Sequence, residues 1–444
     1  MTKRSGQALQ LLQRFESRNV TFMESDGSWP IIWDRARGTR VWDVDGKKYV
    51  DFTAAFGVAA AGHGNARVVA AAASQMRRLL HAMGDVHPHE FKGRLARELS
   101  RLTFERWLPN RRRTTAKALF GSSGFEAVEA ALKTAFLGTG KPGIVVFQGA
   151  YHGTGYGALN ATHREHFRSP FRRQLGKFGS FLPFPAKQAD LDNLERQLVR
   201  LFRRKAIGAV LVEPIQARGG INIPPAEFLP LLRRVCDQED GLLILDEIYT
   251  GLGRTGRWFA CEHTHTVPDL ICLGKALTGG FPLSVCLGRA DLMDAAWPRS
   301  TGEAIHTSTF LGHPVGCAMA LAQLAEIQRK DLVNCSAALG AELLAALQTL
   351  HAPAGYVMRA RGLGLIAGLE ITEPKGQPAT KVVLQVVKRM LRSGFILLPE
   401  GEHSNVIGFT PPLTITTAEI SRMMRALQDC LSVSGETRVK AADR

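Results

Sequence analysis

The sequence predicts an α/β fold in which a mostly parallel sheet is flanked by helices. Five short, mostly apolar runs alternate with helical stretches, and a Gly, Asp or Glu follows each of them within two residues. Uninterrupted apolar runs are typical of strands that are covered on both faces. Strands that alternate with helices indicate βαβ units, whose strands lie parallel. The runs are 116–120, 144–147, 209–212, 242–245 and 270–273.

The pattern changes after about residue 325, which predicts a second, smaller α+β domain. Amphipathic helices are expected over 324–350 and 380–393, with short strands near 363–371, 395–398 and 406–409. Near the N-terminus, 41–50 reads as a hairpin because Asp45-Gly46 is a strong turn signal. We therefore expect an N-terminal segment (1–60) that contributes to the small domain, a large domain that holds the main sheet (61–325) and a C-terminal small domain (326–444).

Composition places the chain among ordinary globular proteins. It has 444 residues, of which 45% are hydrophobic and 22% are charged. Two stretches without charged residues, 142–163 and 304–325, contain Gly, Pro and polar residues, so neither is apolar enough for a bilayer span. The N-terminus has no apolar export segment, and the seven cysteines are scattered without a CxxC pair. We expect a cytoplasmic protein with reduced thiols and no membrane partner.

Charge and cysteine spacing suggest two further partners, neither of which we expect. The net charge is +16, with basic clusters at 111–113, 172–173 and 203–205 that carry no interleaved aromatic residues. A solvated basic surface is the simpler interpretation, and nucleic-acid binding stays as an alternative of a different class. Cys261-x-His263-x-His265 has zinc-like spacing but lacks an evident fourth ligand, so we expect no metal.

Three polar features follow the carboxyl ends of predicted strands, the edge where ligands bind in open α/β sheets. Gly121-Ser-Ser-Gly124 precedes a helix predicted from Glu126, whose first N–H groups could hold a phosphate. Asp246 follows one buried run, and Lys275 follows another. Each alone has a plainer interpretation, such as a connecting turn or a helix cap. Together they are what pyridoxal phosphate requires: an anion cradle, a lysine for its aldehyde and a carboxylate for its pyridine nitrogen.

With these residues the chain resembles the class III aminotransferases, a family of fold-type I pyridoxal phosphate enzymes that includes ornithine, acetylornithine, 4-aminobutyrate and ω-amine transaminases. The resemblance runs from about residue 42 to residue 412. It is carried by Ser123-Gly-Phe125, Leu273-Gly-Lys-Ala-Leu-Thr-Gly-Gly280 and Asp246-Glu-Ile-Tyr-Thr-Gly-Leu-Gly-Arg-Thr-Gly256. It implies that Lys275 forms the Schiff base and that Asp246 contacts the pyridine nitrogen, which makes these two the candidate catalytic residues.

The resemblance also implies the surroundings of the cofactor. Tyr151 would stack on one face of its ring and Ile248 on the other, and Thr309 would reach the phosphate of a neighbouring subunit, which implies a homodimer with shared active sites. Phe56 is a candidate substrate contact. The candidate cofactor-binding residues are Ser123, Gly124, Phe125, Tyr151, His152, Glu213, Asp246, Ile248, Tyr249, Lys275 and Thr309.

Several departures from the family pattern concern the substrate. Phe125 stands where the family usually has Ala, Ser or Thr, and Tyr249 stands where many members have Gln. Members that use glutamate carry a Glu and an Arg that form a switchable pair, and this chain has Arg218 and Gly408 at those positions. In one interpretation Arg218 reaches into the space vacated at Gly408 and binds a substrate carboxylate. In the other, Arg218 is solvated and the pocket accepts amines without a nearby carboxylate.

The resemblance therefore implies transamination from a primary amine or ω-amino acid donor to a keto acid acceptor, with pyruvate favoured over 2-oxoglutarate. A pyridoxal phosphate-dependent aminomutase or amino-acid racemase of the same family is the alternative.

Overall fold

The computed structural model describes residues 3–24, 27–108 and 115–442, and its central feature is a seven-stranded sheet. Six strands run parallel, and only β10 runs antiparallel to its neighbours β4 and β9. This confirms the predicted mostly parallel sheet. In spatial order the strands are β4 (Ala116–Gly121), β10 (Ser284–Arg289), β9 (Leu270–Leu273), β8 (Leu242–Asp246), β7 (Ile207–Val212), β5 (Gly143–Phe147) and β6 (Gly179–Leu182).

Helices cover both faces of this sheet, because successive side chains of its strands point to opposite sides. Val146 packs in a cluster with residues of α6, whereas Val145 packs in a second cluster with residues of α9 and α10. The helix α9 buries one stripe, Leu191, Leu194, Leu198 and Phe202, at the spacing of an amphipathic helix. The helices of this half are α3 (Ala66–Arg78), α4 (Glu90–Leu102), α5 (Phe104–Trp107), α6 (Gly124–Thr139), α7 (Tyr156–Leu159), α8 (Glu165–Arg168), α9 (Leu191–Arg204), α10 (Phe228–Gln238), α11 (Ala290–Ala296) and α12 (Pro314–Arg329).

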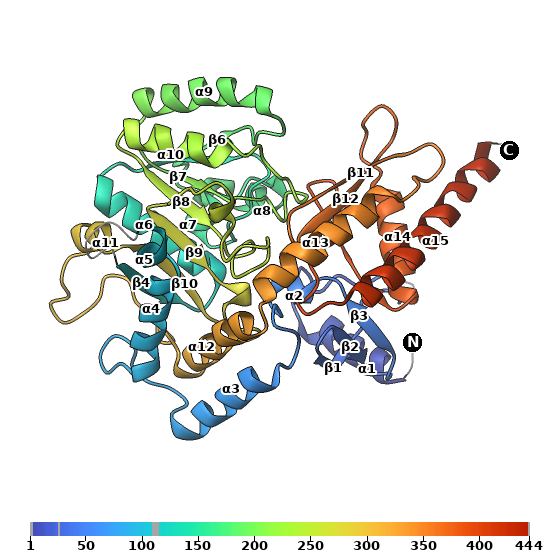
Figure 1. Cartoon of the computed structure of the whole chain (residues 1–444), viewed down its shortest axis with the longest axis horizontal. Helices are drawn as coiled ribbons and strands as arrows, with labels where there is room; N and C mark the ends of the chain where they lie inside the picture. The colour runs from blue at the N-terminus through green and yellow to red at the C-terminus, as the bar shows by residue number, and fades with distance from the viewer. Residues whose placement is uncertain (1–2, 25–26, 109–114, 443–444) are drawn as a thin grey trace.

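Two four-stranded sheets make up the other half, which combines both ends of the chain (Figure 1). The predicted hairpin is β2–β3, and β13 adds to it in parallel, with Phe395 opposite Val50. The first sheet has the order β1 (Trp33–Arg37), β2 (Arg40–Asp43), β3 (Lys48–Asp51) and β13 (Phe395–Ile396). The second has the order β11 (Val357–Gly362), β12 (Ala367–Thr372), β15 (Val406–Phe409) and β14 (Leu398–Glu400).

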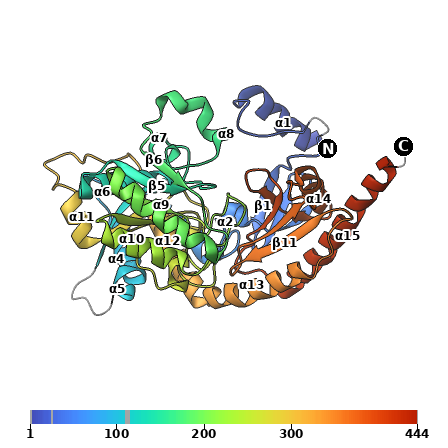
Figure 2. The ribbon, with the colours of Figure 1, turned by 90° about the horizontal axis from the view of Figure 1, so that it is seen from above.

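Helix α13 runs from the seven-stranded half toward β11, as Figure 2 shows from above. The single helix predicted over 324–350 is wrong: α12 ends at Arg329 and α13 begins at Leu332. Between them Asp331 adopts a positive φ of 50°, which breaks the helix and lets α12 pack on α3 while α13 packs on β11. The other helices of this half are α1 (Lys3–Phe15), α2 (Ala54–Gly57), α13 (Leu332–Gln348), α14 (Thr380–Arg392) and α15 (Thr417–Ala442).

Some sequence-based expectations stay predictions. The domain boundaries at residues 60 and 325 are untested, and the basic cluster 111–113 lies outside the described residues. Among the helices that the structure describes, none combines the length and apolar character that crossing a bilayer demands.

Candidate active site

A cavity of about 270 Å³ lies at the carboxyl ends of strands β7, β8 and β9. Parallel strands bring their carboxyl ends to one edge, so residues distant in sequence meet there. Most of the candidate residues converge on this cavity. Its lining consists of Gly124, Phe125, Tyr151, His152, Gly153, Thr154, Glu213, Arg218, Asp246, Ile248, Tyr249 and Lys275.

The N-terminus of α6 forms one side of the site. Ser123 is its N-cap residue, and the Ser123 hydroxyl is buried without a hydrogen bond to the protein. A side chain at Gly124 would bring its Cβ to 3.1 Å from Ile248 Cδ1, so glycine lets the backbone approach closely. The first N–H groups of a helix have no partner within the helix and favour an anion.

Asp246 and His152 form a buried pair at the cavity. His152 Nδ1 lies 2.8 Å from Asp246 Oδ2, and both side chains are almost completely buried. Because an ionised carboxylate only accepts, His152 donates from Nδ1. The backbone N–H of Ile248 also donates to Asp246, over 3.1 Å. These contacts hold the carboxylate in one orientation.

Lys275 follows β9 and presents its amine to the same cavity. Burial lowers the pKa of Lys275, while the nearby carboxylates of Asp246 and Glu213 oppose that shift. Its Nζ lies 4.5 Å from the centre of the Tyr249 ring. A lowered pKa increases the fraction of neutral amine at neutral pH, which is the nucleophilic form.

Glu213 also lines the cavity, and its carboxylate holds two segments of backbone in place. Its carboxylate accepts from the backbone N–H of Tyr151 over 2.9 Å and from that of Ala217 over 3.2 Å. Burial raises the pKa of Glu213 to about 7, with His152 lowering it and Asp246 raising it. Glu213 thus connects the loop that carries Tyr151 to the loop that carries Arg218.

Arg218 lines the cavity, and its partner is a residue that the sequence did not indicate. Its Nε lies 3.7 Å from Glu400 Oε2, and its guanidinium carbon lies 5.7 Å from the Tyr151 ring centre. The space at Gly408 that one of the two interpretations of Arg218 uses is occupied, because a Cβ there would lie 2.9 Å from Glu400 Cγ. The side chain of Glu400 fills that space.

Phe56 and Thr309 do not line this cavity. Phe56 is 50% exposed and lies in α2, where Ala54, Ala55, Phe56 and Gly57 all have positive φ values. Gly57 of this left-handed turn packs on the Tyr249 ring, which a Cβ would approach to 3.0 Å. Thr309 is exposed in a turn before α12. The roles of both residues stay predictions.

The match to a known family fits this geometry. Residues 22–431 match a family model described as Aminotransferase class-III. The chain belongs to the class III aminotransferases. It is 34% identical to 5-aminovalerate aminotransferase of Pseudomonas aeruginosa, over 90% of this chain and 93% of that protein. It is 33% identical to 4-aminobutyrate aminotransferase of Escherichia coli, again over 90% and 93% of the two chains.

Solved structures agree with the fold of this aminotransferase. An amine transaminase from an uncultivated Pseudomonas species, solved with pyridoxal phosphate bound, superposes with a TM-score of 0.84 at 29% identity. The alignment covers 94% of this chain and 98% of that one. The family and this relative identify pyridoxal phosphate as the cofactor.

The cavity of this aminotransferase fits pyridoxal phosphate. The free hydroxyl of Ser123 and the start of α6 suit the phosphate, and the buried Asp246 suits a protonated pyridine nitrogen. Lys275, whose pKa is lowered by burial, suits the aldehyde of the cofactor, because the neutral amine is the form that reacts with it. When bound, the cofactor supplies an electron sink for the bonds at the substrate's amine-bearing carbon.

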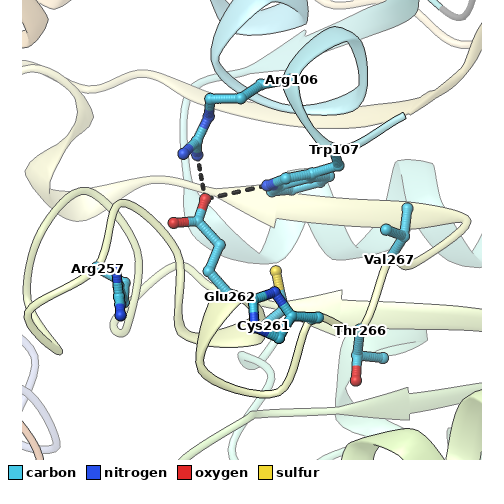
Figure 3. A pocket seen from close by; sticks show the side chains of 8 residues that line it. Arg106, Trp107, Arg257, Cys261, Glu262, Thr266 and Val267 are labelled. Atoms are coloured by element: carbon cyan, nitrogen blue, oxygen red, sulfur yellow. Dashed lines mark hydrogen bonds and ion pairs between the residues drawn. The ribbon is translucent and has the colours of Figure 1, made fainter. Parts of the chain in front are cut away.

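A second cavity, of about 290 Å³, contains part of the candidate zinc motif (Figure 3). Cys261 and His265 line it, whereas His263 Nε2 lies 3.0 Å from the carbonyl oxygen of Thr255. The Glu262 carboxylate accepts from Trp107 Nε1 over 3.0 Å and pairs with Arg106. Among the described residues, no three His, Cys, Asp or Glu side chains lie close enough to share a metal ion.

Sequence reasoning missed two charged groups near the main cavity, Glu400 and Arg164. Glu400 ends the apolar strand β14, which is the same signal that pointed to Asp246. Arg164 precedes α8, and both burial and the positive charge of Arg218 lower its pKa. Nothing in the local sequence of Arg164 indicates that it lies near Arg218.

Proposed function

We propose that this aminotransferase moves an amino group from a primary amine or ω-amino acid to a keto acid, with pyruvate favoured over 2-oxoglutarate. The observation that carries the proposal is the convergence of Lys275, Asp246 and Arg218 on one cavity. A lysine and a carboxylate suit the cofactor's chemistry, and an arginine suits a substrate carboxylate.

We assign the roles of the cavity residues as follows. Lys275 would hold the cofactor covalently and then, as a free amine, move the proton at the substrate's amine-bearing carbon. Asp246, oriented by His152, would keep the pyridine nitrogen protonated. Tyr151 and Ile248 would flank the ring, and the start of α6 with Ser123, Gly124 and Phe125 would bind the phosphate.

Two observations support the substrate classes. The relatives named for 5-aminovalerate and 4-aminobutyrate act on molecules with an amine at one end and a carboxylate at the other. Glu400 fills the space at Gly408 with a carboxylate, which would repel a second carboxylate on the substrate. Pyruvate carries one carboxylate and 2-oxoglutarate carries two, so this charge favours pyruvate.

A homodimer with shared active sites is part of the same proposal. Thr309 lies outside the cavity of its own chain and would serve a neighbouring subunit. Large apolar side chains are exposed near it in the sequence and on the segment that follows α3, a pattern that indicates a covered surface. They are Leu79, Leu80, Met83, Val86, Ile305 and Phe310.

We also propose the three-part division at residues 60 and 325 and a cytoplasmic location, which the seven free cysteines support.

The visible absorption spectrum of the purified protein tests the proposed reaction. Single amines, 5-aminovalerate and glutamate are added in turn without an acceptor, and bleaching of the yellow band reports amino transfer to the cofactor. Pyruvate or 2-oxoglutarate is then added, and return of the band identifies the acceptor. A mutase or racemase would rearrange or invert its substrate without net amino transfer to an added keto acid. The absence of a yellow band after reconstitution with pyridoxal phosphate would contradict the proposal.

A further inference from the structure

Tyr249 is held in place through both its hydroxyl and its ring. Its hydroxyl lies 3.1 Å from the hydroxyl oxygen of Thr410, which itself donates to the carbonyl oxygen of Thr53 over 3.2 Å. Because the Thr410 hydroxyl has a single proton, Tyr249 donates the first of these bonds. Gly57 lies against the ring, where a Cβ would come within 3.0 Å of Tyr249 Cε1. The hydroxyl is therefore engaged by the protein, and it is the ring that meets Lys275.

The amine of Lys275 lies over this ring, with Nζ 4.5 Å from the ring centre. In the part of the chain that the structure describes, Lys275 Nζ forms no ion pair or hydrogen bond with the protein. Lys275 also has a positive φ of 35°, which is unfavourable for a residue with a side chain and persists only where the surroundings impose it. The turn of α2 packs on the segment 275–277 as well as on Tyr249, so one wall supports both residues.

The charged groups that face Lys275 act on it from a distance, because each of them has a partner of its own. Burial lowers the pKa of Lys275, three carboxylates oppose that shift, and one guanidinium adds to it. Two of the carboxylates accept hydrogen bonds from a histidine or from backbone N–H groups, and the third pairs with the guanidinium. These four groups are Asp246, Glu213, Glu400 and Arg218.

We propose that Tyr249 is a positioning residue for the proton transfer: the face of its ring receives the amine of Lys275 whenever that amine is free and carries a proton. The inference rests on the proposed function, in which Lys275 becomes an ammonium when it takes the proton from the substrate's amine-bearing carbon. It becomes a neutral amine again when it gives that proton to the cofactor. An aromatic face stabilises a cation without a hydrogen bond, so Tyr249 keeps the charged lysine in the cavity and leaves its protons free to move.

The protonation of the free Lys275 amine tests the proposal. The full-length protein is loaded with pyridoxamine phosphate, a form of the holoenzyme in which Lys275 is not attached to the cofactor. Trace labelling with acetic anhydride at a series of pH values, followed by peptide mass spectrometry, gives the pH at which half of the Lys275 amine is neutral. Exposed lysines of the same chain serve as the internal reference, because no variant should change the pH at which they react.

Three changes at position 249 separate the ring from the hydroxyl. Tyr249→Leu removes the aromatic face and should lower the pH of half-maximal labelling of Lys275 by about half to one and a half pH units. Tyr249→Phe keeps the face and should change this pH much less. A trifluorinated phenylalanine at position 249 keeps the shape of phenylalanine but weakens the negative potential of the face. It should follow Tyr249→Leu, and it serves if that variant does not fold.

A matched control is Tyr156→Leu, which removes a ring that is 54% exposed and should label at Lys275 as the wild type does. The same labelling pH in the wild type, in Tyr249→Leu and in the fluorinated variant would overturn the inference. A change in Tyr249→Phe as large as in Tyr249→Leu would also overturn it, because the hydroxyl would then carry the effect.

The outcomes separate this inference from the proposed function. Labelling needs only the free amine of Lys275, so it gives a result whether or not an amino group is transferred. The expected order of labelling in a protein that transfers no amino group would contradict the proposed function alone. Normal amino transfer by a protein in which Tyr249→Leu leaves the labelling of Lys275 unchanged would contradict the inference alone.

Discussion

His152 and Asp246 meet over 2.8 Å at the floor of the cavity, and neither side chain is open to solvent. An ionised carboxylate in such a place depends on its hydrogen-bond donors, because burial without them is costly. His152 is thus a positioning residue for the group that would contact the cofactor.

Replacing His152 by Leu removes this donor and should weaken binding of pyridoxal phosphate. A buried hydrogen bond to a charged group contributes about 1.5–3 kcal/mol, which corresponds to roughly 10–150-fold in affinity. Equilibrium dialysis with the cofactor measures the change. Tyr156→Phe is the control, since its hydroxyl contacts only the exposed side of the loop at Gln174. Equal cofactor affinity in the wild type and His152→Leu would show that Asp246 needs no support from the ring.

Replacing Lys275 by Ala should abolish covalent attachment of the cofactor and reduce turnover by at least roughly 10²–10⁴-fold, the contribution of a positioned proton carrier. Borohydride reduction followed by mass spectrometry of the intact chain measures attachment. Lys133→Ala, at an exposed position of α6, should retain both properties. A cofactor adduct on Lys275→Ala would move the assignment to another lysine.

Replacing Met83 by Glu should weaken the proposed dimer, because a charge would enter the exposed apolar surface that follows α3. Sedimentation velocity at several protein concentrations measures the dissociation, which we expect to shift by at least roughly tenfold. Cofactor affinity should fall with it if Thr309 serves the neighbouring subunit. Leu384→Glu introduces the same charge at an exposed site on α14 and should change neither property. A wild-type chain that sediments as a monomer would refute the shared site.

Glu326 should contribute a pH-dependent part of the stability. Its carboxylate accepts from Arg329 and from Asn65, and these partners lower its pKa to about 2. A group with a lowered folded-state pKa stabilises above its unfolded value near 4.5 and loses that contribution as the pH falls toward 2. Glu326→Gln should therefore lower the free energy of unfolding by roughly 1 kcal/mol at pH 7 and by less at pH 3.5. Urea unfolding of the wild type and the variant at both pH values measures this difference. A difference of the same size at pH 7 and pH 3.5 would contradict an ionic origin.

Replacing either of two helical glycines by alanine should change the stability of the protein, in opposite directions at the two positions. A Cβ at Gly340 of α13 would lie 2.1 Å from backbone atoms of Gly364, so Gly340→Ala should destabilise by about 1–3 kcal/mol. Gly93 of α4 has no neighbouring atom within 4 Å, so Gly93→Ala should stabilise by roughly 0.5–1 kcal/mol. Urea unfolding of the two variants measures both changes. Tolerance of Gly340→Ala without loss would mean that α13 can move away from Gly364.

The sequence predicted the parallel sheet and most of the cavity because their signals are local. Asp246 ends one apolar run and Lys275 lies two residues after another, and parallel strands must bring such ends together. Glu400 was missed because its role depends on contact with Arg218, which is 182 positions away in the chain and is set by the pairing of two loops. The break at Asp331 was missed because no Gly or Pro marks it.

The left-handed turn in α2 has a consequence for selection. Ala54, Ala55 and Phe56 hold positive φ values that cost an ordinary residue about 1–2 kcal/mol each, and this turn packs beside the segment of Lys275. Glycine would relieve the strain at any of the three positions. It would also loosen the wall that supports Tyr249. Populations selected for heat tolerance and populations selected for turnover should therefore accumulate different residues at these three positions.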